Sequence, residues 1–150
     1  MTLTEIEDSL PWGLHDAYLE SLDGDALQGR VHLVLRVMMS EAQDLDQRAR
    51  IEILGLTYLY LEPPEAEAPD LEAAPSEGLW IDAGAVSPTA VPAPLPPPPP
   101  GCFVHRIFVH RWNRSLFLCA RSARLEWLEP APLPARARTR ALLPGTNISK

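Results

Sequence analysis

The chain has 150 residues, enough for one domain, and 46% of them are hydrophobic, an ordinary share for a globular protein. No apolar run of about 18 residues occurs, which argues against a transmembrane helix. The formal net charge is −7, and the acidic residues Glu5, Glu7 and Asp8 occupy the region where a signal peptide would carry positive charge. We therefore expect a cytoplasmic protein with no membrane partner.

The first part of the chain predicts a short helix followed by three strands. Thr4 and Glu7 have the spacing of a capping box, so one or two helical turns are expected near the N-terminus. Residues 14–22 alternate loosely, residues 30–38 alternate clearly, and residues 48–61 form a long β-favouring run. These three segments are predicted strands.

The middle of the chain has a different composition. Twelve of the 17 prolines fall within residues 62–101, and Pro96–Pro100 is an unbroken run expected to adopt the polyproline II form. Within this segment the apolar island at residues 78–81 predicts a short edge strand or a plug against the core. We interpret the remainder as a mobile loop inserted into the domain.

The β pattern returns after the insertion. Residues 102–111 alternate, and residues 116–127 are predicted as the partner strand of a hairpin. A two-residue turn at Asn113 and Arg114 would place Cys119 opposite Phe108 and well beyond disulfide reach of Cys102. We therefore expect two reduced thiols that pack in the interior.

Together these segments predict a mainly β protein, an antiparallel sandwich or partly open barrel of about five to six strands. A single β domain is expected over residues 1–134, interrupted by the proline-rich insertion at 62–101. Residues 135–150, with their arginines, are expected to form a disordered basic tail.

His15 and Asp16 are the pair most suggestive of chemistry. Adjacent residues of a strand point to opposite faces, so within a strand at 14–22 they could not form a hydrogen-bonded dyad. No serine or cysteine stands in a G-x-S-x-G context. We expect both residues to tie the entry loop to the first strand through backbone hydrogen bonds, and we expect no catalytic site.

The histidines and aromatic residues give no diagnostic motif. C-x-x-C and H-E-x-x-H are absent, and His105 and His110 would face opposite sides of one strand, so neither a metal nor a cofactor is expected. Arginine lies beside aromatic residues on the strand at 102–111, but the acidic composition makes nucleic acid an unlikely partner. The tryptophans are expected to be core or hairpin anchors; they are Trp12, Trp80, Trp112 and Trp127.

Charge is divided unequally along the chain. Residues 1–82 contain 18 acidic and 4 basic side chains, whereas residues 83–150 contain 2 acidic and 9 basic ones. The two sets could neutralise each other across one surface, or the acidic set could form a face that attracts a basic partner. The candidate partner-binding carboxylates are Asp16, Glu20, Asp23, Asp25, Asp44 and Asp46.

A hydrophobic-His-Asp-Ala opening at residues 14–17 is followed by amphipathic segments at 29–35 and 49–56 and by a closing segment at 112–118. In these features the chain resembles a loose group of small, mostly uncharacterised bacterial β proteins. Some of that group resemble immunity proteins, which neutralise the toxins of polymorphic systems. The proline-rich insertion departs from the resemblance, and the resemblance implies no catalytic residues.

The leading hypothesis is therefore a non-enzymatic protein-interaction domain, of the immunity-inhibitor type, that binds a basic protein through the acidic residues. The alternative is a small-molecule-binding β-barrel or sandwich, which could be an enzyme. In that case the candidate pocket residues are His15, His32 and His105.

Overall fold

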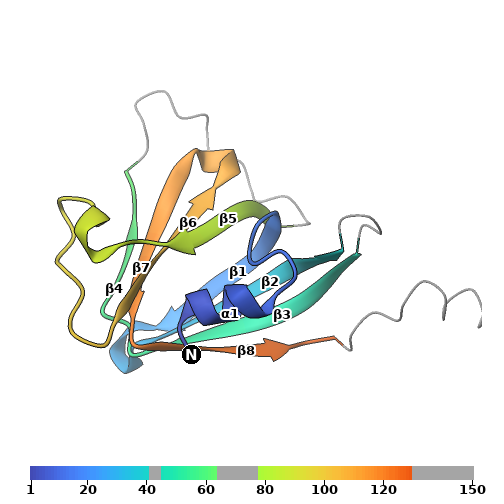
Figure 1. Ribbon diagram of the computed structural model, residues 1–150, viewed down its shortest axis with the longest axis horizontal. Coiled ribbons are helices and arrows are strands. Elements are labelled where there is room, and N and C mark those ends of the chain that lie inside the picture. Colours follow the sequence, from blue (N-terminus) through green and yellow to red (C-terminus); the bar gives the residue numbers. More distant parts are fainter. Residues whose placement is uncertain (41–44, 64–77, 130–150) are drawn as a thin grey trace, which may run out of the picture.

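The computed structural model describes residues 1–40, 45–63 and 78–129 (Figure 1). This part of the chain forms one antiparallel sheet of eight strands in the order β4-β7-β6-β5-β1-β2-β3-β8, which confirms the mainly β prediction. The strands are β1 (Ala17–Asp25), β2 (Arg30–Ser40), β3 (Leu45–Leu54), β4 (Tyr58–Leu61), β5 (Leu79–Ala85), β6 (Phe103–Val109), β7 (Arg114–Ala120) and β8 (Ser122–Trp127). The helical segments are α1 (Leu3–Ser9), η1 (Ala26–Gln28), η2 (Pro88–Ala90) and η3 (His110–Trp112).

The sheet bends sharply where β3 continues into β4 and where β7 continues into β8. At this point the Arg121 N–H donates to the carbonyl oxygens of Leu54 and Gly55, each at 3.2 Å, so the two bends are hydrogen-bonded to each other. Gly55 has a φ of +64°, and a Cβ there would lie 2.8 Å from the Arg121 Cβ. Only glycine can adopt this positive φ and approach Arg121 so closely without strain.

These bends explain why the structure has more strands than expected. The runs at 48–61 and 116–127 were each predicted as one strand, but each is divided in two, because β3 pairs with β8 whereas β4 pairs with β7. The expectation of a sandwich or partly open barrel is met only in part, since the described strands form a single sheet that does not close.

The hydrophobic core lies between the two halves of the bent sheet, and α1 bridges them by packing against β8 and β5 (Figure 1). Leu3 and Ile6 of the helix are fully buried in this core. The helix begins two residues earlier than expected, because Thr2 and Glu5 form the capping box instead of Thr4 and Glu7. The buried strand residues include Leu33, Leu35, Ile51, Ile53, Ile81, Ile107 and Leu118.

β5 corrects the interpretation of the proline-rich segment. It lies between β1 and β6, so residues 79–85 are an interior strand and neither an edge strand nor a plug in a mobile loop. The sequence hides this strand because only Leu79 and Ile81 are large and buried, and the alanines and glycine that follow carry no alternating pattern.

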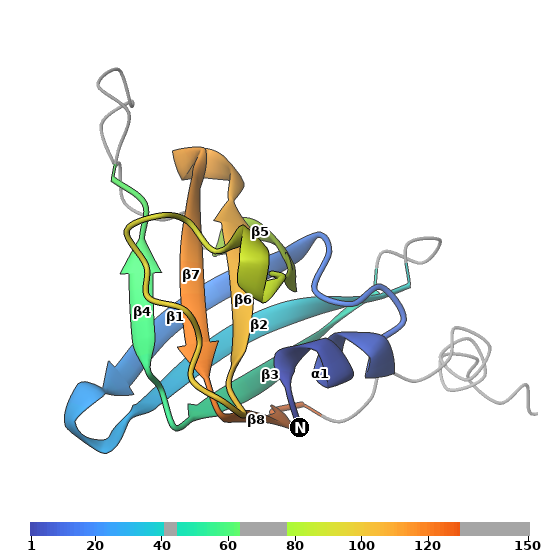
Figure 2. The same ribbon diagram turned by 60° about the vertical axis from the view of Figure 1, so that its left-hand side comes forward.

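The proline-rich chain after β5 crosses the outer face of β4 and β7 (Figure 2). Its partly buried residues include Pro92, Leu95 and Pro98, and the Leu95 N–H donates to the Pro92 carbonyl oxygen at 2.9 Å, so the chain turns at residues 92–95. Phe117 and Cys119 lie on the face of β7 opposite the hydrophobic core, yet their exposed fractions are only 5% and 0%. We attribute their burial to this proline-rich cover.

The predicted register of the β6–β7 hairpin is wrong. The chain reverses through residues 110–113, which comprise η3 and a left-handed Asn113, so Val109 pairs with Arg114 and Cys119 lies opposite Val104. Cys102 and Cys119 are free thiols, as expected, but the argument that they lie far apart on the ladder fails. Burial raises the pKa of the Cys119 thiol, which favours its protonated form.

Candidate functional site

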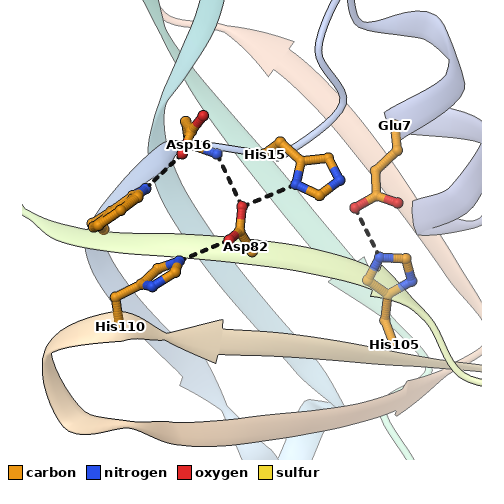
Figure 3. Close-up of polar contacts among 7 residues, drawn as sticks. Glu7, His15, Asp16, Asp82, His105 and His110 are labelled. Atoms are coloured by element: carbon orange, nitrogen blue, oxygen red, sulfur yellow. Dashed lines mark hydrogen bonds and ion pairs between the residues drawn. The ribbon is translucent and has the colours of Figure 1, made fainter.

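Asp82 of β5 is the centre of a hydrogen-bonded group of side chains on the outer face of the sheet (Figure 3). His15 Nδ1 lies 3.0 Å from Asp82 Oδ1, and His110 Nε2 lies 2.7 Å from Oδ2. The backbone N–H of Asp16 also donates to Oδ1, at 3.2 Å. Because an ionised carboxylate only accepts hydrogen bonds, each ring nitrogen facing it carries the proton. We call His15, Asp16, Trp80, Asp82 and His110 the Asp82 cluster.

Three separate segments bring the cluster together. β1 begins at Ala17, so His15 and Asp16 lie in the preceding turn and not in a strand, contrary to the sequence prediction. Asp16 has a φ of 54°, a left-handed conformation that turns its backbone N–H toward β5. His110 opens η3 directly after β6, next to β5 in the sheet.

The donors around Asp82 also set its charge. Partial burial would raise the pKa of the Asp82 carboxyl, but hydrogen bonds from His110, the Asp16 N–H and His15 outweigh burial and lower that pKa. The carboxylate is therefore ionised at neutral pH and holds both imidazoles in place.

Trp80 is the large exposed side chain of the cluster. Its exposed fraction is 45%, yet its Nε1–H donates to Asp16 Oδ1 at 2.9 Å. Its ring stacks on His110 with centroids 3.9 Å apart and an interplanar angle of 15°. His110 in turn packs edge-on against Phe108, at 5.0 Å between centroids. Trp80 is thus held on two sides while presenting a large area to solvent.

The expectation for the tryptophans fails in most cases. Trp12, Trp80 and Trp127 are 47%, 45% and 38% exposed, so they are surface residues and not core anchors. Trp112 is partly buried and packs against the core, as expected.

The chemistry available to the cluster is that of positioned imidazoles and carboxylates. An imidazole oriented by a carboxylate is a component of many acid–base sites. In the described ranges, no group of three or more His, Cys, Asp or Glu residues is arranged to hold a metal ion.

The predicted acidic residues do not form one open acidic face. Asp16 belongs to the Asp82 cluster, whereas Glu20 and Asp46 are joined through Arg36, at 2.9 and 3.2 Å, on the outer face of β2 and β3. Glu20 also pairs with Arg48 at 2.7 Å. These carboxylates are already neutralised by neighbouring arginines.

The remaining carboxylates lie elsewhere. Asp25 accepts the backbone N–H groups of Leu27 and Gln28 and so holds the turn between β1 and β2. Asp23 is exposed on β1, and Asp44 lies outside the described residues. Arg124 pairs with Glu52, so a basic residue of the later part of the chain neutralises an acidic residue of the earlier part, which favours mutual neutralisation over an acidic docking face.

The three pocket histidines do not come together. His15 is in the Asp82 cluster, while His32 lines an open, charged cleft beside Arg50 and Arg124. His105 is fully buried, with its Nε2 3.1 Å from Glu7 Oε1 of α1 (Figure 3). A common pocket for His15, His32 and His105 is therefore excluded.

An apolar cleft of about 500 Å³ opens between β1, β4 and η3, away from all three histidines. Leucine side chains form most of its wall, and Trp112 contributes an aromatic surface. Its lining residues are Leu19, Glu20, Ser21, Leu22, Leu59, Leu61, Leu79, Val109, Trp112 and Leu116.

Sequence reasoning missed Trp80, Asp82 and His110 as partners of His15 and Asp16. A usable signal was present, because Trp80 and Asp82 are two apart and would share a face of any strand through residue 81. The predicted short strand or plug ended at residue 81, so Asp82 was assigned to the loop.

No protein-family model, curated protein or solved structure matches the chain. None of the helices in the described ranges is both long and apolar enough to span a membrane.

Proposed function

We propose that the chain is a non-enzymatic protein-interaction domain that binds its partner through the Asp82 cluster. The observation that carries this proposal is the fixed position of a half-exposed Trp80, stacked on His110 and hydrogen-bonded to Asp16. Tryptophan is enriched among the residues that contribute most to protein interfaces. A side chain that is already immobile also loses little conformational entropy on binding.

The surroundings of Trp80 have the composition of an interface. Tyr18 is the cross-strand partner of Trp80 on β1, and Phe108 and Arg106 continue the same face on β6. Aromatic residues and arginine are the types enriched at protein interfaces, and the carboxylates of Asp16 and Asp82 supply polar anchors among them. The partner-binding role therefore moves from the dispersed acidic residues to this face, and of the predicted set only Asp16 is retained.

The partner class follows from the resemblance noted in the sequence. An immunity-type inhibitor binds one toxin domain tightly and needs no catalytic residue of its own. A rigid, preformed contact surface suits such a task because it limits the entropy lost on association. We therefore propose a protein partner of the toxin type, with the Asp82 cluster at the centre of the contact.

Affinity capture from host lysate with matched variants tests the proposal. Wild type and Trp127→Ala, which removes an equally large exposed tryptophan from β8, should retain one stoichiometric protein after nuclease treatment. Trp80→Ala should lose that protein while keeping the circular dichroism spectrum of the wild type. Equal capture by all three proteins would exclude this surface, and no capture by wild type would reject the interaction function.

The apolar cleft favours a second candidate function, the binding of a small apolar molecule. Its volume of about 500 Å³ lies within the usual range of ligand pockets, and its walls are mainly leucine. A thermal-shift titration with a medium-chain fatty acid would detect such binding. Replacing Leu59 with arginine should abolish the shift if the cleft is the site, and no shift in wild type would reject this candidate.

A further inference from the structure

We propose that Trp80 and Asp16 together receive an arginine side chain of the partner protein. This inference rests on the proposed interaction function and adds the chemistry of the residue that the surface recognises. The motivating observation is that an aromatic face and a carboxylate, both open to solvent, are joined by a hydrogen bond of 2.9 Å.

Trp80 supplies the stacking surface. His110 stacks nearly parallel on the indole, and 45% of Trp80 nevertheless remains exposed to solvent. The face of an indole carries negative electrostatic potential and attracts cations, with tryptophan the strongest of the aromatic side chains in this respect. A half-exposed indole held by His110 and Asp16 is a suitable surface for a planar cation.

Asp16 supplies the charge. Its Oδ1 accepts from the indole Nε1–H, which places the carboxylate at the rim of the ring. Within the described residues its other oxygen, Oδ2, is left to accept a hydrogen bond from a ligand. The left-handed backbone and the Asp16 N–H bond to Asp82 hold this carboxylate where it is.

The neighbouring charges leave this position available for a cation. Both oxygens of Asp82 are already bonded, to His15 and Asp16 on one side and to His110 on the other. Arg106 of the same face donates to Ser115 Oγ at 2.7 Å and lies 5.4 Å from the centre of the Phe108 ring. It is held there and not beside Asp16.

Arginine fits this arrangement better than lysine. A guanidinium is flat, so it can lie parallel to the indole while its in-plane N–H groups reach a carboxylate at the ring's edge. An ammonium group has no plane to stack on the indole, so it makes only part of the same contact. The site therefore discriminates both against a neutral side chain and, to a smaller degree, against lysine.

Nuclear magnetic resonance of the full-length protein tests this directly. The probe is acetyl-Gly-Arg-Gly-amide, compared with the same peptide carrying citrulline, the uncharged analogue of arginine, or lysine. The arginine peptide should shift the Trp80 indole N–H signal in a saturable manner. The lysine peptide should bind more weakly and the citrulline peptide more weakly still. The signal of Trp80 is assigned by its loss in Trp80→Phe.

Asp16→Asn is the decisive variant because it changes the charge and little else. Asparagine keeps an acceptor for the indole N–H and tolerates positive φ as well as aspartate does. The affinity for the arginine peptide should fall by about three- to five-fold, the loss expected of an exposed ion pair. Asp23→Asn makes the same charge change elsewhere on β1 and should leave the affinity unaltered.

Equal affinities for the arginine and citrulline peptides, or unchanged affinity in Asp16→Asn, would overturn the inference. The result is separable from that of the capture experiment. If the peptide binds as expected but Trp80→Ala still captures the partner, the arginine site stands and the proposed interface fails. If capture requires Trp80 but arginine and citrulline bind alike, the interface stands and the arginine inference fails.

Discussion

Asp82 Oδ2 lies 2.7 Å from His110 Nε2, and this hydrogen bond joins the middle of β5 to the start of η3. This one contact joins the first residue of the hairpin turn to β5, the strand that lies within the proline-rich segment. With His15 on the other carboxylate oxygen, it links three segments that are distant in the sequence. The stability of the outer face therefore depends strongly on a single carboxylate.

Asp82→Asn should loosen the cluster. The asparagine can still accept at one oxygen, but its amide group cannot accept the hydrogen bond from His110. Hydrogen bonds to charged groups contribute about 1.5–3 kcal/mol when buried, so we expect a loss of about 1–2 kcal/mol at this partly exposed site. Urea unfolding measures this loss in the free energy of unfolding. Asp23→Asn, at an exposed position, should change stability by less than about 0.5 kcal/mol.

The contribution of Asp82 should depend on pH in a defined direction. Its folded-state pKa is lowered from the ordinary 3.8, so the unfolded chain takes up the proton first as pH falls. The stabilisation is present above the unfolded pKa and is lost as pH decreases through the folded one. The difference in unfolding free energy between wild type and Asp82→Asn should therefore shrink as the pH falls below about 5. A difference that stays constant down to pH 3 would contradict this account.

Gly55→Ala should strain the bend between β3 and β4. The alanine would have to adopt a φ of +64°, and its Cβ would lie 2.8 Å from the Arg121 Cβ. We expect a loss of about 1–3 kcal/mol, measured by thermal or urea unfolding. Gly84→Ala is the matched control, since no atom lies within 4 Å of a Cβ at that position and its φ is not positive. It should be neutral or slightly stabilising, and equal losses for both variants would refute the explanation.

Glu7→Ala should weaken the attachment of α1 to the sheet. Glu7 Oε1 lies 3.1 Å from Nε2 of the fully buried His105, and removing the carboxylate leaves this imidazole in the core without its polar neighbour. A loss of about 2–3 kcal/mol is expected. Asp8→Ala, at the next and exposed helix position, should have little effect. A double-mutant cycle with His105→Phe isolates the pair, and a coupling energy near zero would show that the two residues act independently.

Much of the fold was predictable from local patterns. The alternation at residues 30–38 is β2, and the buried side chains are those expected, Val31, Leu33, Leu35 and Val37. Period-two patterning is a property of the strand itself and needs no knowledge of its neighbours. The division of the runs at 48–61 and 116–127 was not predictable, because each bend exists only where the two runs meet at Gly55 and Arg121.

The site was predictable only in part. His15 and Asp16 were singled out, but only the fold brings Asp82, 67 residues after His15, and His110, 28 residues after Asp82, into contact with them. Short-range patterns report which face a side chain occupies, not which distant side chain it meets. The acidic residues illustrate the same limit, because Arg36 and Arg48 neutralise Glu20 only once β1, β2 and β3 are aligned.

The class of the fold and the buried faces of the clearest strands follow from the sequence alone, because hydrophobic periodicity is a property of consecutive residues. Only the tertiary structure decided that residues 79–85 form an interior strand, that the sheet bends at Gly55, and that Trp80 stands half-exposed over His110. These features depend on register between distant strands, and register is set by packing of the whole core. For that reason the candidate interface became visible only when β1, β5 and β6 were placed side by side.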